Sequence, residues 1–242
     1  MLTEESFADF TCPYCGEQIS FPMDYIGFVQ ACPSCDESVI VPEATVASGH
    51  KLPLPISTAR LALRRFRAGD WRDLMECLSD EEMFRYVDGQ PLDEEHILRW
   101  LEADSHVKLT TPGQPFCLGI EIRSSEKLIG YLSLSFTDVQ RVQASLSIYI
   151  GRNYQRQGYA TEAIAAMLEF CFVGIKLHRI TASCDSRHIA ARRVLEKLGM
   201  RCEGEFLKDH FADGDWQNTV FYGILSEEYR NRNGIQSKVP VT

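Results

Sequence analysis

Residues 155–160, with the sequence QRQGYA, combine the residue types that let a protein backbone bind an anion. Gly158 and the small Ala160 allow close approach to the backbone, and Arg152 and Arg156 add positive charge nearby. If a helix begins at this point, the free N–H groups of its first turn and its dipole both favour negative charge. The stretch therefore predicts a place to hold a pyrophosphate.

The flanking residues have the patterns of a strand and a helix. Residues 145–150 (SLSIYI) alternate and are β-branched, which predicts a strand, and residues 161–172 (TEAIAAMLEFCF) have the apolar spacing of a helix. Glu162, in the first turn of that helix, is interpreted as structural because it favours the helix dipole. Turns of this kind are common and most of them bind nothing, so a purely structural turn is the alternative. The loop is not a Walker loop, because no Gly-Lys-Ser/Thr follows, and it lacks the Gly-x-Gly-x-x-Gly of dinucleotide sites.

Four cysteines near the N-terminus form a second pattern with chemical meaning. Cys12 and Cys15 make one CxxC pair, Cys32 and Cys35 make another, and sixteen residues separate the pairs. Four thiolates from two such turns provide a closed tetrahedral site for structural Zn²⁺. The alternative is a pair of redox dithiols, but the surroundings lack a thioredoxin-like pattern. We expect a zinc ribbon over residues 1–45 whose folding depends on the metal.

Charge is distributed unevenly along the 242-residue chain, whose net charge is −9. Residues 1–50 hold eight acidic side chains and no Lys or Arg, while the remainder holds 25 basic and 26 acidic ones. Binding a nucleic acid needs cations that displace counterions, so the ribbon is expected to contact protein rather than nucleic acid. No apolar run is long enough to cross a bilayer and no signal peptide opens the chain, which predicts a cytoplasmic protein without membrane contact.

The rest of the chain predicts one mixed α/β domain. A linker is expected over 46–56, the domain over 57–232 and a tail over 233–242. Four strands are expected between about 115 and 150, and no internal repeat is evident in the chain. The other expected elements are strands at 58–64, 178–184, 201–211 and 216–225, and helices at 70–78, at 93–101 with Asp93 as N-cap, and at 189–198. This order predicts a mixed sheet flanked by helices.

Several short motifs, taken in order, resemble the GNAT superfamily of N-acetyltransferases. The 155–160 loop matches the superfamily's pyrophosphate loop, Gln/Arg-x-x-Gly-x-Gly/Ala. The resemblance is to the ribosomal-protein acetyltransferase branch, of the RimJ/RimL type, and covers about residues 56–230. Its motifs are Thr58-x-Arg60-Leu-x-Leu-Arg64, Gly158-Tyr-Ala-Thr-Glu162-Ala, Val194-Leu-Glu-Lys-Leu-Gly199-Met, Glu203-Gly204, and Asp213-Gly214-x-Trp216 through Tyr222-x-Ile-Leu.

The resemblance implies acetyl transfer from acetyl-CoA to a primary amine, which attacks directly in a ternary complex. It places the cofactor where strands 145–150 and 178–184 separate, with a backbone N–H near 149–151 holding the thioester carbonyl. The acceptor is expected to be a small molecule that carries an amine, or a protein N-terminus. The residues expected to contact acetyl-CoA are Ile150, Gln155, Arg156, Gln157, Gly158, Tyr159, Ala160, Thr161 and His188.

The sequence departs from the family at the positions of the usual proton donor. His188 stands at the position of an Asn, Ala191 at that of a Ser, and Leu195 at that of an alternative Tyr. His188 is a candidate acid, since imidazole titrates near neutral pH, and Tyr149 is a second candidate catalytic residue. A role for His188 as a helix cap or a pantetheine contact is the favoured alternative. These departures keep open a GNAT-like protein that binds acyl-CoA for regulation or interaction and has little turnover.

Overall fold

The computed structural model describes residues 7–12, 15–22, 29–40, 54–86, 89–109, 113–138, 142–212 and 214–235. The chain divides into two compact units, Met1–Pro53 with Asp138–Val142, and Leu54–Thr137 with Gln143–Thr242. Several predicted features lie outside the described residues: part of the ribbon, including 41–45, most of the linker, 46–53, the motif residue Asp213, and positions 236–242 of the tail. The predicted domain boundaries therefore stay predictions.

The small unit contains two antiparallel hairpins, each closed by a CxxC pair. The strands are β1 (Phe7–Thr11) with β2 (Gln18–Pro22), and β3 (Val29–Ala31) with β4 (Ser38–Ile40). Equivalent backbone bonds close the two turns, because Cys12 N–H donates to the Glu17 carbonyl at 2.8 Å and Cys32 N–H to the Glu37 carbonyl at 2.9 Å. The two hairpins thus repeat one another at a spacing of twenty residues, and the prediction of no internal repeat is wrong.

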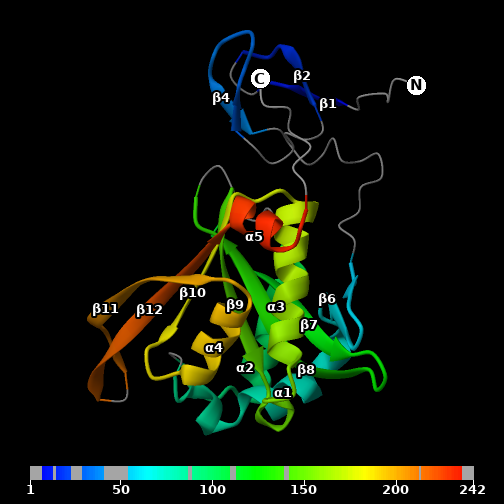
Figure 1. The fold of residues 1–242 in the computed structure, drawn as a ribbon. Helices are drawn as coiled ribbons and strands as arrows, with labels where there is room; N and C mark the ends of the chain where they lie inside the picture. The colour runs from blue at the N-terminus through cyan, green and yellow to red at the C-terminus, as the bar shows by residue number, and fades with distance from the viewer. Residues whose placement is uncertain are drawn as a thin grey trace. The chain divides into compact units, whose positions relative to one another are not determined.

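The large unit is built on one eight-stranded sheet in the order β11-β12-β10-β9-β8-β7-β6-β5 (Figure 1). Neighbouring strands are antiparallel except for β9 and β10, which are parallel. The strands are β5 (Ile56–Ser57), β6 (Leu61–Arg64), β7 (Phe116–Ile122), β8 (Lys127–Phe136), β9 (Gln143–Ile150), β10 (Arg179–Asp185), β11 (Arg201–Ala212) and β12 (Asp215–Leu225).

Helices cover both faces of this sheet. One layer holds α3 and α4, which contact β9 and β10 respectively, and the other holds α1 and α2, of which α1 packs against β8 (Figure 1). Among the described residues, three short helices also belong to the unit: η3 lies before α1, η4 lies after α1, and η5 lies after β9. The helices are η3 (Ala68–Asp70), α1 (Trp71–Leu78), η4 (Glu81–Phe84), α2 (Glu94–Ser105), η5 (Arg152–Tyr154), α3 (Tyr159–Glu169), α4 (Ile189–Lys197) and α5 (Ser226–Arg232). The predicted mixed α/β sheet flanked by helices is confirmed.

Most predicted elements of the large unit lie within a few residues of their expected positions. Asp93 caps α2 as predicted, since its Oδ1 accepts from the His96 N–H at 2.9 Å. Four strands were expected between 115 and 150, but the described residues there form three, of which β8 is ten residues long. The helix after the 155–160 loop is also longer than expected, since α3 continues as a π-helix over Phe170–Gly174.

Close packing fixes β8 and β9 against α1. A Cβ on Gly130 of β8 would lie 2.0 Å from the Tyr149 carbonyl oxygen, and one on Gly151 would lie 2.6 Å from the Cys77 Sγ. Both positions therefore require glycine for close approach. The Tyr131 ring, from β8, packs against the core formed by α1 and α2, and Tyr131 pairs with Tyr149 near the end of β9.

Candidate functional site

The parallel ladder between β9 and β10 ends well before the strands do. Its three residue pairs are Gln143–Arg179, Ala144–Ile180 and Ser145–Thr181. Beyond them β9 continues to Ile150 and β10 to Asp185 without further pairing between the two strands. The sheet therefore opens at the carboxyl ends of its only parallel pair among the described strands, which is where ligands enter open α/β sheets.

A backbone N–H of β9 points into this opening. The Gly151 N–H, just after β9, donates to the Ile129 carbonyl of β8 at 2.8 Å. Alternate residues of a strand direct their N–H groups to opposite neighbours, so the Ile150 N–H points toward β10. The Ile150 carbonyl on the same side accepts from Gln155 Nε2 at 3.0 Å. Of the expected 149–151 stretch, Ile150 is thus the residue with a donor in the opening.

The 155–160 loop leads directly into the N-terminus of α3. Gly158 is the N-cap residue and has a left-handed backbone, with φ of 83°. The first backbone bond of the helix runs from the Glu162 N–H to the Gly158 carbonyl at 3.0 Å. The N–H groups of residues 159–161 precede this bond and point out of the helix end. The geometry is that of a helix N-terminus which can accept an anion.

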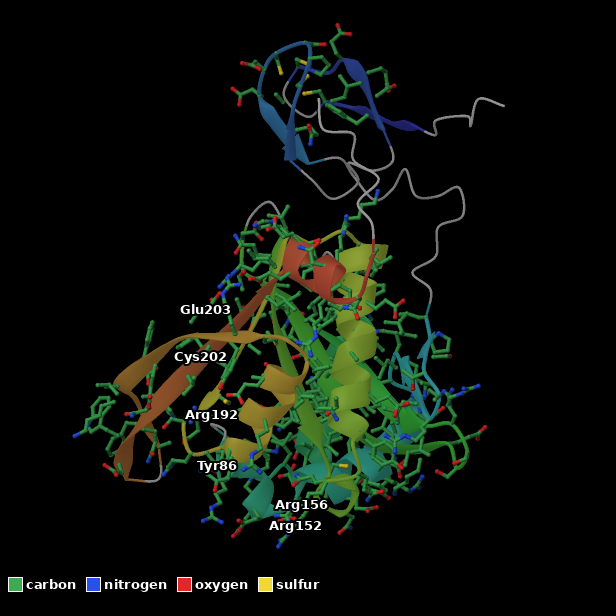
Figure 2. All side chains as sticks on the ribbon, viewed as in Figure 1. Tyr86, Arg152, Arg156, Arg192, Cys202 and Glu203 are labelled. Carbon is green, nitrogen blue, oxygen red and sulfur yellow. The ribbon has the colours of Figure 1, made fainter. Side chains whose placement is uncertain are left out.

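The polar side chains of the loop have different roles. Gln155 bonds to the Ile150 carbonyl and Gln157 Nε2 donates to the Asn153 carbonyl at 3.0 Å, so both hold the loop's shape. Arg152 and Arg156 are exposed and lie at the end of the unit where α3 begins (Figure 2). They add positive charge beside the helix N-terminus.

Glu162 has a more specific position than its predicted interaction with the helix dipole. Its Oε1 accepts from Thr58 Oγ1 at 2.6 Å and from the Arg60 N–H at 2.9 Å, and its Oε2 accepts from Arg60 Nε at 2.7 Å. Partial burial raises the pKa of this carboxyl, but the hydrogen bonds from Thr58 and Arg60 outweigh burial and lower the pKa. Glu162 therefore joins the turn between β5 and β6 to the first turn of α3.

His188 occupies the N-cap position of α4, but its side chain makes no capping hydrogen bond. Its ring instead stacks on Tyr86, with ring centroids 4.8 Å apart and an angle of 28° between the planes. Burial lowers the pKa of the imidazole, and the nearby Asp185 carboxylate offsets this only in part. A neutral, stacked imidazole is thereby favoured at neutral pH.

The second candidate catalytic residue, Tyr149, and the residues at the usual Ser and Tyr positions, Ala191 and Leu195, have less polar side chains than His188. Tyr149 stacks on Tyr131, with centroids 4.8 Å apart and planes 13° apart. Burial, and then the neighbouring Tyr149, raise the pKa of Tyr131. On α4, Leu195 is buried and Ala191 is half-buried. Tyr149 and His188 thus stack on different aromatic neighbours.

A cavity of about 390 Å³ is lined in part by Tyr86, the residue on which His188 stacks. Its described lining comes from the end of η4 and the segment after it, the end of β10 and the residues just after it, and the turn end of β11. Within it, Asp185 is paired with Arg187 at 2.6 Å, and the Arg187 guanidinium carbon is 5.9 Å from the Tyr86 ring centroid. The described residues that line the cavity are Phe84, Arg85, Tyr86, Gly89, Gln90, Asp185, Arg187, His210, Phe211 and Ala212.

Sequence reasoning did not single out Tyr86, Asp185 or Arg60 for this site. Arg60 belongs to the recognised Thr58–Arg64 motif, which was the one available signal. Tyr86 lies about 100 residues before His188, and no local pattern connects the two positions.

The small unit brings its four cysteine sulfurs together. The ligand atoms of Cys12, Cys15, Cys32 and Cys35 all lie within 4.8 Å of one another. The Cys12–Cys35 and Cys15–Cys32 sulfur pairs are each 3.8 Å apart. Four sulfurs bound to one Zn²⁺ at about 2.3 Å would lie about 3.8 Å apart, so the cluster fits a tetrahedral metal.

Comparison with known proteins identifies the family. The family model for the acetyltransferase (GNAT) domain matches residues 60–201. The uncharacterized N-acetyltransferase YnaD of Bacillus subtilis is 32% identical over 174 residues, which cover 72% of this chain and 98% of that protein. The chain belongs to the GNAT family. This acetyltransferase also resembles the spermidine N(1)-acetyltransferase of Escherichia coli, at 28% identity over 36% of this chain and 47% of that one.

A solved structure agrees with this assignment. The GNAT-family acetyltransferase of Bacillus anthracis superposes with a TM-score of 0.64 at 27% identity, covering 71% of this chain and 98% of that one. The protein is therefore an N-acetyltransferase, and acetyl-CoA is the acyl donor of its family. The alternative of a binding protein with little turnover is not favoured. Among the described helices, none has the length and apolar character needed to span a membrane.

Proposed function

We propose that this GNAT acetyltransferase binds acetyl-CoA along the opening between β9 and β10, with the pyrophosphate on the backbone of residues 156–161. The observation that carries the proposal is the left-handed Gly158 N-cap, which aims the first N–H groups of α3 outward at the end of that opening. Arg152 and Arg156 add attraction for the phosphates. This pose would place the thioester near the end of β9.

The Ile150 N–H is the proposed donor to the thioester carbonyl. It points toward β10 past the end of the ladder, where a carbonyl oxygen could accept from it. A backbone donor fixed in a strand stabilises the negative charge that develops on this oxygen when the amine attacks.

The acceptor is a primary amine that attacks the thioester directly in the ternary complex. The cavity lined by Tyr86 and Asp185 is the proposed entry for the amine, because it reaches the carboxyl end of β10. A small-molecule amine agrees with the relative named as a spermidine acetyltransferase, and a protein N-terminus is the acceptor expected from the ribosomal-protein branch. The amine must be neutral to attack, and holding it close to the thioester supplies much of the acceleration.

His188 is proposed to contact the pantetheine arm or the acceptor rather than to act as the acid. Its lowered pKa and its stacking on Tyr86 favour a neutral ring that packs against substrate. A thiolate is a good leaving group, so the departing CoA needs little help from a protein acid. Tyr149 stays a candidate whose side chain is committed to stacking on Tyr131.

The four clustered cysteines are proposed to hold one structural Zn²⁺ in an N-terminal ribbon over residues 1–45. Cys12, Cys15, Cys32 and Cys35 would supply four thiolates, which leave no open position for catalysis at the metal. The ribbon carries acidic residues and no cations, so a protein-contacting role is proposed rather than nucleic-acid binding. The protein is proposed to act in the cytoplasm.

The activity is tested by measuring release of free thiol from acetyl-CoA with a panel of amines. The panel should contain polyamines, aminoglycosides, amino-acid amides and short peptides with free N-termini. We expect thiol release above the rate without acceptor for one class, with an acetylated product of matching mass. Binding of CoA without release for any amine would contradict the proposed transfer while leaving the cofactor site intact.

A further inference from the structure

Arg60 lies in the turn between β5 and β6 and contacts the loop and helix that form the proposed pyrophosphate site. Its Nη1 donates to the Gln157 carbonyl at 3.0 Å, and its Nε forms the 2.7 Å ion pair with Glu162. The guanidinium carbon lies 4.4 Å from the centroid of the Tyr159 ring. One side chain thus contacts three consecutive features of the site across about 100 residues of sequence.

The bond to the Gln157 carbonyl determines where the next N–H points. In a trans peptide the C=O and the N–H that follows it point in opposite directions, so the Gly158 N–H points away from Arg60. A Cβ built on Gly158 would lie 3.4 Å from Arg60 Nη2, which places Arg60 on the side-chain side of this residue. The Gly158 N–H is thereby directed to the opposite side of the loop.

The backbone on either side of Gln157 is left-handed, with φ of 59° at Arg156 and 83° at Gly158. A residue with a side chain, such as Arg156, adopts this conformation only when its surroundings stabilise it. The Arg60 bond to the intervening carbonyl supplies such stabilisation. Without that bond, the Gln157–Gly158 peptide is free to rotate and the N–H loses its direction.

Arg60 is itself held in place by Glu162. The carboxylate, with a side chain 19% exposed, also accepts from Thr58 Oγ1 and from the Arg60 backbone N–H. We propose that Arg60 is a positioning residue that orients the Gln157–Gly158 peptide so that its N–H faces the CoA pyrophosphate. The inference rests on the proposed function, because it requires the pyrophosphate to lie on this loop.

The test compares two single substitutions that each remove one guanidinium bonded to a backbone carbonyl, Arg60 in the turn between β5 and β6 and Arg123 in the turn between β7 and β8. Arg60→Gln removes the bond to Gln157, whereas Arg123→Gln removes an exposed guanidinium whose Nη1 donates to the Thr58 carbonyl at 2.8 Å. The affinity of the full-length protein for CoA is measured by calorimetry. Turnover is measured with acetyl-CoA and with acetyl-pantetheine, a donor that lacks the pyrophosphate.

We expect Arg60→Gln to weaken CoA binding by about tenfold to a hundredfold, as for loss of hydrogen bonds to a charged group. The kcat/KM with acetyl-CoA should fall because KM rises. The kcat/KM with acetyl-pantetheine should equal that of the wild type. Arg123→Gln should change CoA affinity by less than about threefold, as for one screened surface charge. Equal losses in the two variants would overturn the inference, since Arg60 would then act only through its charge.

Two further outcomes separate this inference from its premise. Equal losses with both donors would mean a general structural role for Arg60 and would also overturn the inference. Failure of the wild-type protein to bind CoA would instead refute the proposed function. If Arg60→Gln does not fold, Glu162→Gln replaces it, because the amide weakens the Arg60 ion pair while its oxygen still accepts from Thr58. The same selective loss with acetyl-CoA is then expected, and an equal loss with both donors contradicts it.

Discussion

Gly158 shows how one residue combines two demands on the proposed cofactor site. The sequence suggests that glycine is needed because the phosphate approaches closely, whereas the structure places the missing side chain toward Arg60. The left-handed φ of 83° is the second demand, since a β-branched residue rarely adopts it. Glycine is therefore needed at this position for the left-handed backbone and for the space that Arg60 occupies, and not for the space that the phosphate fills.

Gly158→Val should consequently weaken CoA binding by at least about tenfold, through a rearranged loop and a displaced guanidinium. Calorimetry with CoA measures the effect, and thermal unfolding should show that the domain stays folded. Gly204→Val is a matched control, because Gly204 meets no atom within 4 Å and has no left-handed φ. An unchanged affinity in Gly158→Val would remove the loop from the cofactor site.

His188→Ala tests whether the imidazole transfers a proton or only contacts substrate. We expect KM for acetyl-CoA or for the amine to rise while kcat at saturation changes only a few-fold. A general acid would instead contribute about 10²–10⁴-fold to turnover. Because burial lowers the pKa of His188, an acid role would also make kcat fall as pH rises through a value below 6.5. A selective loss of kcat, with loss of such a pH dependence, would establish His188 as the acid.

At the scale of elements, α1 and the end of β9 are fitted to one another at Gly151 and Cys77. Gly151→Ala would place a Cβ 2.6 Å from the Cys77 Sγ, a distance that forces one element to move. We expect a loss of about 1–3 kcal/mol in the free energy of unfolding, as for overpacked cores. The Cys77→Ala background removes the sulfur, so adding Gly151→Ala there should cost clearly less. Additive losses in the double variant would show that this contact is not the cause.

The elements themselves were largely predictable because their signals are local. The Asp93 cap, the apolar spacing of α4 and the loop before α3 each depend on a few neighbouring residues. The prediction of four strands between 115 and 150 was wrong, because the described residues there form three, and β8 runs for ten residues through Gly130, where it approaches Tyr149 closely. Patterns of neighbouring residues in the sequence do not show how closely two strands approach one another.

The contacts that complete the site were not predictable for the same reason. Arg60 meets Glu162 across 102 residues, and Tyr86 meets His188 across a similar distance. Each pair depends on the sheet order, which brings the turn after β5 to α3 and the segment after η4 to α4. The sequence shows these residues but does not show which of them come into contact in the folded protein.

At the scale of the whole molecule, the metal should matter to the small unit alone. Its two short hairpins bury little apolar surface, so a bound Zn²⁺ would supply most of their folding free energy. We expect about one Zn²⁺ per chain by elemental analysis. Cys12→Ser with Cys32→Ser should abolish that content and leave CoA affinity unchanged. Purified protein without zinc, or a loss of CoA binding on removing the metal, would contradict the account.

The central claim is that the N–H groups at the start of α3 and of Ile150 receive acetyl-CoA. Backbone amide shifts of the ¹⁵N-labelled protein on titration with CoA test it most directly. With CoA, we predict the largest shift changes at the amides of Gly158, residues 159–161 and Ile150. With pantetheine alone, we predict a shift change at the Ile150 amide and none at the amides of 158–161. Saturable CoA binding that leaves the amides of 158–161 unperturbed would contradict the claim.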